Sequence, residues 1–367
     1  MNRVVSKFIL TRYILIVSAF ILFGCSQEQI EPDPIKSANC EYYFINEPIG
    51  NCGFGLDEVP YCVDCPDEEG NLGTYNILID QPNDSFSESV PLRPTILAVH
   101  GYLPNTSEPV APYAGLTLNL MRSVFCKYGY SIAALQYRQD VKGFGEGPIC
   151  ELDPREIVKT HYRAIQDLRR ALNKIYENPA AYGIDIDNLF LFGNSQGGMA
   201  VLNGVFATNE EEWLATLPAE FQDLKNELGP WMPRKSVKGV ISIAAPLYGL
   251  ELFDASDNVP LFLSHGVCDV PVPYKSGTYF GCPFDKTIHG SYAIACRANE
   301  LGKPYSLYSV KGLGHDYTEE INDALRVQIR EWVKDQVICG TPTPEEFTLT
   351  ANEVDCAETG ISVADCQ

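Results

Sequence analysis

The stretch LFLFGNSQGG, residues 189–198, decides the fold of this chain. Its first half is a continuous apolar run, which predicts a β-strand covered on both faces. Its second half has the pattern Gly-x-Ser-x-Gly, whose small residues permit a sharp turn that lifts the Ser195 hydroxyl above the end of the strand. The helix expected next presents an electropositive N-terminus to that hydroxyl. The stretch therefore predicts a strand, a tight turn with an exposed nucleophile, and a helix.

Short apolar runs alternate with longer amphipathic segments on both sides of this stretch. Helical periodicity is clearest at residues 157–176 and 318–337, where apolar side chains recur every three or four residues. Alternating strands and helices indicate an α/β fold with a mostly parallel central sheet flanked by helices. The expected strands are residues 75–80, 95–100, 131–136, 189–193, 237–244, 261–264 and 305–310.

Three further motifs follow expected strands, at the edge where an open α/β sheet places its ligands. They are HGY at residues 100–102, HGVCDVPVP at 265–273 and GLGH at 312–315. A carboxylate that orients an imidazole, and an imidazole that takes the serine proton, would complete a Ser-His-Asp triad. We therefore expect Asp269 to be the acid and His315 the base that serve Ser195.

Other residues compete for these two roles. His289, in a Gly-Ser-Tyr loop, is an alternative base, because a histidine on a loop can serve wherever the fold brings it beside the serine. Asp316 is a rival acid, although adjacent residues rarely reach the same imidazole productively. We expect His100 to brace its own loop and His161, inside a helix, to be structural.

The chain order serine, acid, histidine is the order found in α/β-hydrolases. With the four motifs, the sequence resembles the α/β-hydrolase superfamily, in its carboxylesterase and acetyl-xylan or feruloyl-esterase-like branch, over residues 74–337. YGIDID at 182–187 and YR at 137–138 resemble segments of carboxylesterases and esterase-lipases. The HGGG segment of the hormone-sensitive-lipase group is missing.

This resemblance implies the α/β-hydrolase fold and a serine hydrolase that cleaves carboxylic esters through an acyl-enzyme. Carbohydrate-linked and lipid esters, small or attached to a polymer, are the expected substrates. The backbone N–H groups of Tyr102 and Gln196 are the implied oxyanion hole. The reaction requires no metal and no organic cofactor. A prolyl-oligopeptidase-like peptidase is the alternative enzyme, and a catalytically inactive surface binding module is the alternative from another class.

Composition restricts the partners and the compartment. The net charge of −21 argues against nucleic acid and against a helix lying on an anionic membrane. Thirteen cysteines indicate an oxidising compartment, but the odd number leaves one over. LFGC at residues 22–25 follows a basic leader and an apolar run, and resembles a bacterial lipobox. It implies cleavage after Gly24, a lipid on Cys25, and an exported lipoprotein held at the outer membrane or cell surface.

Five segments follow from these patterns. They are a signal peptide at 1–24, a tether at 25–39, a Cys-rich extension at 40–73, the catalytic domain at 74–337 and an acidic Cys-rich tail at 338–367. The Gly-rich connection 139–149 is expected to line the substrate pocket, with Tyr102 and Tyr248 as walls. Residues 209–235 form either a lid or a surface helix whose aromatic side chains join the core.

The cysteines after the tether are expected to form structural disulfides. Cys62 and Cys65 lack the second close pair of a zinc site, so a disulfide is the favoured role. Short loops favour the pairs Cys282–Cys296 and Cys126–Cys150. A bridge from Cys268 would brace the loop that carries Asp269.

Overall fold

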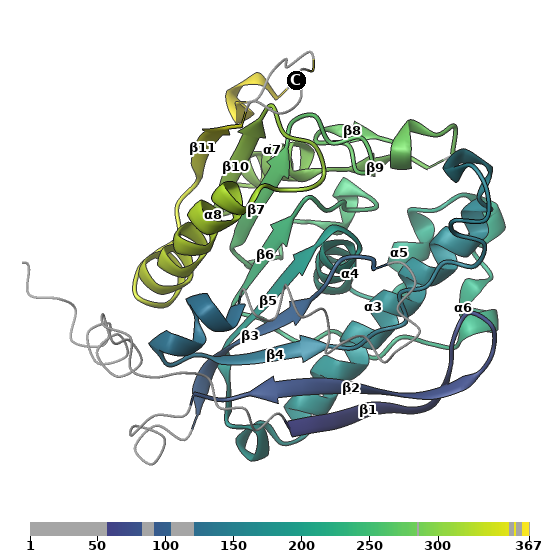
Figure 1. The fold of residues 1–367 in the computed structure, drawn as a ribbon, viewed down its shortest axis with the longest axis horizontal. Coiled ribbons are helices and arrows are strands. Elements are labelled where there is room, and N and C mark those ends of the chain that lie inside the picture. The colour runs from purple at the N-terminus through teal and green to yellow at the C-terminus, as the bar shows by residue number, and fades with distance from the viewer. Residues whose placement is uncertain are drawn as a thin grey trace, which may run out of the picture.

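The structure, a computed structural model, describes residues 57–82, 92–103, 121–284, 286–351, 356 and 362–366. The predicted signal peptide, the lipid attachment at Cys25 and the tether lie outside these residues. A nine-stranded sheet runs through the described chain, with helices on both of its faces (Figure 1). In order across the sheet the strands are β1 (Asp57–Pro66), β2 (Leu72–Asp80), β4 (Ser131–Leu135), β3 (Arg93–Val99), β5 (Ile184–Asn194), β6 (Gly239–Ile243), β7 (Leu261–Gly266), β10 (Tyr305–Lys311) and β11 (Glu345–Thr350).

Most of this sheet is parallel. β2 runs antiparallel to both β1 and β4, and every other neighbouring pair in the sheet is parallel. β3, β4 and β7 are buried along their whole length, as expected of strands covered on both faces. The α/β fold class predicted from the sequence is confirmed, and all seven expected strands are present. A separate two-stranded ribbon pairs β8 (Ser276–Gly277) with β9 (Ile288–His289).

The longest of the described helices, α3 (Pro154–Glu177), has clear signals at both ends. The Asp153 side chain accepts a hydrogen bond from the Arg155 N–H, and Pro154 fills the first helical position. The helix ends at Glu177, and Asn178 follows it. Asn178 precedes Pro179, and a residue before proline disfavours the helical conformation. The described α-helices are α3 (Pro154–Glu177), α4 (Ser195–Phe206), α5 (Glu210–Ala215), α6 (Leu224–Leu228), α7 (Ser291–Glu300) and α8 (Glu319–Glu331), and α8 continues into the π-helical turn η7 (Trp332–Ile338).

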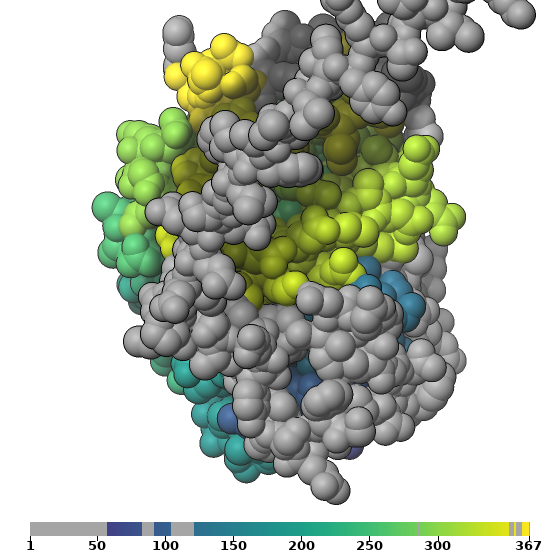
Figure 2. All heavy atoms as spheres, turned by 90° about the vertical axis from the view of Figure 1, so that its left-hand side faces the viewer, coloured from purple at the N-terminus to yellow at the C-terminus, as the bar shows by residue number. Residues whose placement is uncertain are grey.

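The sheet separates two layers of buried side chains. Along β3, Leu97 and Val99 join the layer beneath α3, α4 and α7, whereas Ile96 and Ala98 face the layer beneath α8. This alternation is the period of two that a strand imposes on its side chains. Figure 2 looks onto the second of these faces, where α8 forms a yellow-green band. No helix within the described ranges is both long enough and apolar enough to cross a membrane.

The strand order places a crevice beside the stretch at 189–198. From β3 the chain moves outward to β4, and then returns to β5 on the other side of β3. After β5 it enters α4 on one face, whereas residues 121–126, which follow β3, pack in the layer on the other face. At such a switch point the carboxyl ends of the strands open a ligand crevice. The turns after β3 and β5 therefore meet at the site.

Both Cys-rich segments add strands to the sheet, contrary to the expected domain limits. The expected boundary between residues 73 and 74 falls inside β2, and β1 extends the sheet edge beyond it. At the other end, β11 pairs in parallel with β10. The tail therefore joins the sheet, because the exposed edge of β10 still offers unpaired backbone groups.

The insertion at 209–235 packs onto the core rather than over the nucleophile. Its aromatic side chains Trp213, Phe221 and Trp231 are buried with the layer beneath α3. The Trp213 and Trp231 ring centroids lie 5.3 Å apart. No residue of the insertion lines the cavity beside Ser195. Of the two alternatives left open by the sequence, the structure favours a surface segment with core aromatics.

The disulfide pairs differ from the two suggested by short loops. Cys282 pairs with Cys150 and Cys296 with Cys366, so the expected pairs Cys282–Cys296 and Cys126–Cys150 are wrong. Proximity in sequence fails here because folding brings together segments that are distant along the chain. Cys268 does form a bridge, to Cys356 in the tail, and this bridge holds the loop that carries Asp269. Cys62 pairs with Cys65. Cys126 and Cys339 are each disulfide-bonded as well.

Candidate active site

Ser195 occupies a strained turn between β5 and α4. Its backbone φ is +51°, in the left-handed region that residues other than glycine rarely adopt. The turn is tight because Gly193 and Gly197 allow close backbone approach: a Cβ at Gly193 would lie 2.6 Å from the Gly197 carbonyl oxygen, and one at Gly197 would lie 2.2 Å from that of Val99. The predicted strand, turn and helix are all present around Ser195.

His315 and Ser195 are joined by a hydrogen bond. The Nε2 atom of His315 lies 2.8 Å from Ser195 Oγ, and its Nδ1 lies 2.7 Å from Asp269 Oδ2. The His315 side chain is 21% exposed, so the imidazole remains accessible from the cavity, whereas the Asp269 side chain is fully buried. Because Nδ1 faces the Asp269 carboxylate, the hydrogen on that nitrogen leaves Nε2 free to accept the Ser195 proton.

The loops that carry the acid and the base are bound to each other. The Cys268 N–H donates to the Leu313 carbonyl oxygen at 3.0 Å. Gly266 also approaches the base loop so closely that a Cβ there would lie 2.0 Å from the Gly314 carbonyl oxygen. The two motifs HGVCDVPVP and GLGH therefore form one packed unit, which fixes the separation between carboxylate and imidazole.

Asp269 is held ionised by three donors. Burial disfavours its charge, but hydrogen bonds from His265 and His315 outweigh burial and keep its pKa below the ordinary aspartate value. The Val272 N–H donates to its Oδ1 at 2.9 Å, and His265 Nε2 lies 3.1 Å from its Oδ2. Sequence reasoning did not assign a role to His265. The spacing of four residues between His265 and Asp269 was the signal that could have drawn attention to it.

The proposed oxyanion-hole residues lie on two neighbouring segments, the loop after β3 and the start of α4. Gln196 is in the first turn of α4, where backbone N–H groups have no partner within the helix. Tyr102 lies on the loop after β3, next to Gly101, whose N–H donates to Asn194 Oδ1 at 3.0 Å. Both Tyr102 and Gln196 line the cavity beside Ser195.

A buried glutamine fixes the loop of Tyr102. Gln139 Oε1 accepts a hydrogen bond from the Leu103 N–H at 3.0 Å, and Gln139 Nε2 donates to the Leu103 carbonyl oxygen at 3.1 Å. The Gln196 side chain in turn donates to the Gln139 carbonyl oxygen at 3.0 Å. Gln139 therefore links the turn after β5 to the loop after β3. Sequence reasoning missed this contact, since nothing in the local pattern marks Gln139.

The remaining histidines do not contact Ser195. The Nδ1 of His100 faces the Gly101 carbonyl oxygen at 2.8 Å, so His100 braces its loop, and burial lowers its pKa to about 4. His161 is buried, its Nδ1 lies 2.6 Å from Tyr248 Oη, and burial lowers its pKa to about 3. His289 faces Ser276 Oγ at 2.9 Å instead of the nucleophile. The bond from His315 to Asp269 likewise leaves no role for Asp316 as the acid.

A cavity of about 250 Å³ opens beside Ser195. Its walls are mostly apolar and aromatic, which is typical of sites for small organic ligands. The connection 139–149 contributes Val141, Phe144 and Ile149, as the sequence predicts. The lining residues are Tyr102, Val141, Phe144, Ile149, Leu152, Ile157, His161, Ser195, Gln196, Pro246, Pro271, Val272, Tyr279, Phe280 and His315.

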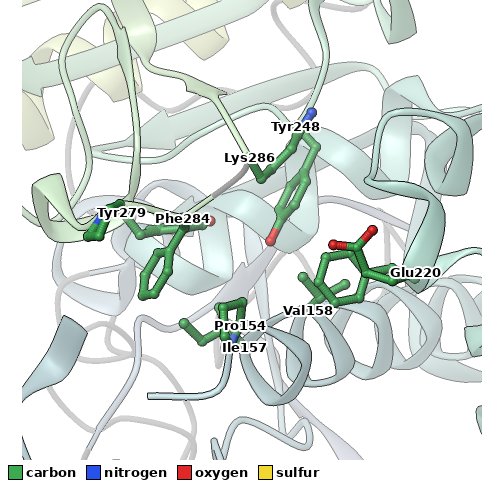
Figure 3. A pocket seen from close by; sticks show the side chains of 10 residues that line it. Pro154, Ile157, Val158, Glu220, Tyr248, Tyr279, Phe284 and Lys286 are labelled. Carbon is green, nitrogen blue, oxygen red and sulfur yellow. The ribbon is translucent and has the colours of Figure 1, made fainter. Parts of the chain in front are cut away.

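A smaller hollow of about 110 Å³ adjoins this cavity and shares Ile157 and Tyr279 with it (Figure 3). Tyr248, expected to be a pocket wall, lines this smaller hollow, and its hydroxyl lies 2.6 Å from His161 Nδ1. Lys286 lies beside the Tyr248 ring, with Nζ 5.7 Å from the ring centroid. Burial lowers the pKa of Lys286, and its ammonium donates to the Thr216 carbonyl oxygen.

Within the described part of the chain, no group of three or more His, Cys, Asp or Glu side chains is arranged to hold a metal ion.

Comparison with known proteins agrees with this architecture. No protein-family model and no curated protein sequence matches the chain. Among solved structures, the propionate-bound esterase Est2 of Thermogutta terrifontis is 13% identical, with 79% of this chain and 97% of that chain covered, at a TM-score of 0.50. The chain has the α/β-hydrolase fold. The α/β-hydrolase fold predicted from residues 189–198 and the strand-end motifs is therefore confirmed.

Two other solved structures are similar at lower scores. The esterase of Pyrobaculum calidifontis is 13% identical, with 82% of this chain and 90% of that chain covered and a TM-score of 0.46. MGS-M1, an α/β-hydrolase enzyme from a Medee basin deep-sea metagenome library, is 14% identical, with 77% and 98% covered and a TM-score of 0.43. At 13% identity the likeness to Est2 bears on the α/β-hydrolase fold alone.

Proposed function

We propose that this chain is a serine hydrolase that cleaves carboxylic esters. The observation that carries the proposal is the continuous hydrogen-bonded series from Ser195 Oγ through His315 to Asp269, at the wall of an apolar cavity. A serine activated by an imidazole, which is oriented in turn by a carboxylate, is the arrangement of acyl-transfer enzymes. The reaction needs these three side chains, the backbone N–H groups of the oxyanion hole and water.

Acylation begins with proton transfer from Ser195 Oγ to His315 Nε2. Oγ attacks the ester carbonyl carbon, and the carbonyl oxygen becomes an oxyanion that accepts hydrogen bonds from the Gln196 and Tyr102 N–H groups. His315 then gives its proton to the departing alkoxide, and the C–O bond of the ester breaks. Asp269 keeps the imidazole in the required tautomer and stabilises its cationic form.

Deacylation repeats these steps with water. His315 Nε2 takes a proton from a water molecule, whose oxygen attacks the acyl carbon bound to Ser195. The tetrahedral intermediate collapses when His315 returns the proton to Ser195 Oγ, which releases the carboxylic acid. Each proton that leaves a nucleophile is thus returned to a leaving group by the same imidazole.

The cavity supports esters with an apolar group of modest size. Its aromatic and aliphatic walls, from Phe144 and Leu152 to Phe280, favour an apolar acyl or alcohol group over a charged one. Small aryl esters of short fatty acids fit this chemistry. Of the two expected substrate classes, lipid esters match the walls better than carbohydrate-linked esters, whose hydroxyl groups need polar partners.

A hydrolysis assay with matched variants tests the proposal. The protein should hydrolyse p-nitrophenyl butyrate, and Ser195→Ala should lower kcat by at least about 10³-fold, because the nucleophile is lost while the oxyanion hole remains. A panel of aryl acetate, butyrate and decanoate, an acetylated sugar and a peptide p-nitroanilide ranks the substrate classes. Full activity of Ser195→Ala would refute the catalytic assignment, and preference for the anilide would favour the peptidase alternative.

A further inference from the structure

A second histidine contacts the carboxylate of the catalytic series. His265, at the end of β7, has a fully buried side chain, and its Nε2 lies 3.1 Å from Asp269 Oδ2. This is the same carboxylate oxygen that His315 Nδ1 approaches at 2.7 Å. Asp269 Oδ2 therefore lies between two imidazoles, one buried beneath it and one facing the cavity.

The surroundings of His265 fix which of its nitrogens carries the hydrogen. The Ser291 N–H at the start of α7 lies 3.3 Å from Nδ1, and a backbone N–H can only donate, so Nδ1 is an acceptor. Nε2 instead faces two acceptors, Asp269 Oδ2 and the Val272 carbonyl oxygen, the latter at 3.1 Å. In the neutral tautomer with hydrogen on Nε2, that hydrogen is shared between Asp269 Oδ2 and the Val272 carbonyl oxygen, and Nδ1 can also accept from the Ser291 hydroxyl, 3.0 Å away.

We propose that His265 is a positioning residue that donates its Nε2–H to Asp269 Oδ2 and thereby sets the orientation and basicity of His315. This inference rests on the proposed function, since it concerns the same triad. With His315 and the Val272 N–H, it gives the Asp269 carboxylate three donors from three directions. A carboxylate held in this way cannot rotate away from the catalytic imidazole without leaving a buried donor unpaired.

The contact also divides the negative charge of the carboxylate. The hydrogen bond from the His265 N–H weakens the negative potential of the Asp269 carboxylate, so the carboxylate stabilises the protonated His315 imidazole less. Removing the His265 donor should therefore make the protonated form of His315 more favourable. The acid limb of the kcat/KM profile, which reports the base of the free enzyme, should then move to higher pH.

The other titratable groups around this pair do not confuse that readout. Tyr274, which follows Asp269 in the same loop, has its ring centroid 5.7 Å from that of His265, and burial raises its pKa to about 12. Tyr317, next to the base loop, is hydrogen-bonded to Ser264, and burial raises its pKa further still. Neither tyrosine changes its charge in the range where the acid limb is measured.

Two substitutions separate positioning from packing. His265→Leu removes the donor and fills the buried space with an apolar side chain. His265→Gln instead places an amide N–H near the position of Nε2. With p-nitrophenyl butyrate, His265→Leu should lower kcat by about 10–100-fold with little change in KM, and should shift the acid limb upward. His265→Gln should restore most of kcat and the position of the limb.

A control in the same layer measures the effect of packing alone. Ser309→Ala removes a buried hydrogen bond from Tyr274, which contacts the His265 ring, but leaves the Asp269 contacts intact. It should lower stability and leave the acid limb in place. If His265→Leu also leaves the limb and kcat unchanged while Ser195→Ala is inactive, positioning is refuted and the proposed function stands.

A spectroscopic test needs no variant and so does not depend on folding of His265→Leu. In the wild-type protein labelled with ¹⁵N in its histidines, we expect His265 Nε2 to carry a hydrogen at neutral pH and Nδ1 to be unprotonated. A hydrogen on Nδ1 with a bare Nε2 would remove the donor to Asp269 and overturn the inference. Inactivity of the wild type toward every ester in the panel would instead count against the proposed function.

Discussion

One backbone angle places the nucleophile. A φ of +51° at Ser195 costs on the order of 1–3 kcal/mol for a residue with a Cβ. The turn keeps this conformation because β5 and α4 are fixed on either side by the sheet and by the close approach at Gly193 and Gly197. As a result Ser195 Oγ is presented to His315 at the end of the strand rather than buried beside it.

Gln139 offers a residue-level test of the oxyanion hole. Gln139→Ala should lower kcat for p-nitrophenyl butyrate by about 10–100-fold, because Leu103 loses both of its bonds and the neighbouring Tyr102 N–H is no longer held in place. The KM should change less, since the cavity walls remain. Steady-state kinetics on the folded variant provide the measurement.

Gln136→Ala is the matched control for this prediction. Gln136 is also a buried glutamine that accepts a bond from a backbone N–H, that of Asn76, but it lies away from the cavity. Its substitution should lower stability by a comparable amount and leave kcat unchanged. Equal losses of kcat in the two variants would mean that Gln139 acts through stability alone.

The residues that sequence reasoning found and those it missed differ in one respect. Ser195, Asp269 and His315 each stand in a local motif at the end of a strand, so the sequence marks them without knowledge of the fold. Gln139 acts through contacts with residues distant in the chain, and His265 through its burial beneath Asp269. The Gln139 contacts exist only once the strands are assembled, so no local pattern predicts them. The spacing of His265 and Asp269 within one motif marks that pair, but only the folded chain shows that the two side chains meet.

At the scale of elements, a disulfide joins two walls of the cavity. Cys150 lies in η2 (Ile149–Glu151), beside Ile149 and Leu152, and Cys282 follows η6 (Tyr279–Gly281), beside Phe280. The double variant Cys150→Ser/Cys282→Ser should raise KM more than it lowers kcat, since the walls move while the triad stays. It should also cost stability of about 2–5 kcal/mol, measured by urea unfolding.

The pair Cys62–Cys65 provides the control for this loss of stability. The residues bridged by the Cys150–Cys282 pair are 132 apart in sequence, and those of the control pair only 3. On loop-closure entropy, the double variant Cys62→Ser/Cys65→Ser should therefore lose about 3 kcal/mol less stability. Equal losses from the two double variants would contradict the entropic explanation and point to local packing.

The central strands were easier to predict than the edges. β3, β5 and β7 each contain a continuous apolar run, at residues 96–99, 189–192 and 261–263, and all three were expected. β1 buries only every third residue and contains two prolines and two cysteines, and β11 begins with two glutamates, so neither resembles a buried strand. Both pair with a sheet edge, where one face stays in water and the apolar signal is weak.

At the scale of the whole molecule, two buried histidines make stability depend on pH. Burial lowers the pKa of His100 from 6.5 to about 4 and that of His161 from 6.5 to about 3. Between these values and 6.5 the unfolded chain binds more protons than the folded chain, so unfolding becomes more favourable as pH falls. Each histidine should cost about 1.4 kcal/mol of stability per pH unit below 6.5.

Substituting one of these histidines measures its share. His161→Gln keeps a polar group near Tyr248 Oη and removes the titration. Between pH 7 and pH 5 the wild type should lose about 2 kcal/mol more unfolding free energy than this variant, by urea denaturation. The same loss in both proteins would show that His161 is protonated in the folded state at pH 5, against the lowered pKa.

The sequence also predicts features beyond the described residues. The lipid on Cys25, export to the cell envelope and the tether stay predictions, since they depend on residues before 57. Within residues 74–337 the predicted fold is confirmed. It could be predicted because alternating strands and helices have few arrangements that bury their apolar faces. The disulfide favoured for Cys62 and Cys65 is present, whereas the pairs between distant cysteines were beyond sequence reasoning, since they depend on which loops the finished sheet brings together.

The central claim is that Ser195 is a nucleophile activated by His315, and covalent labelling tests it most directly. The folded protein should react with a fluorophosphonate at one site per chain, and peptide mass spectrometry should place the adduct on Ser195. His315→Ala should react far more slowly, and Ser195→Ala not at all. An adduct on another residue, or an unlabelled Ser195 in the folded wild-type protein, would contradict the account.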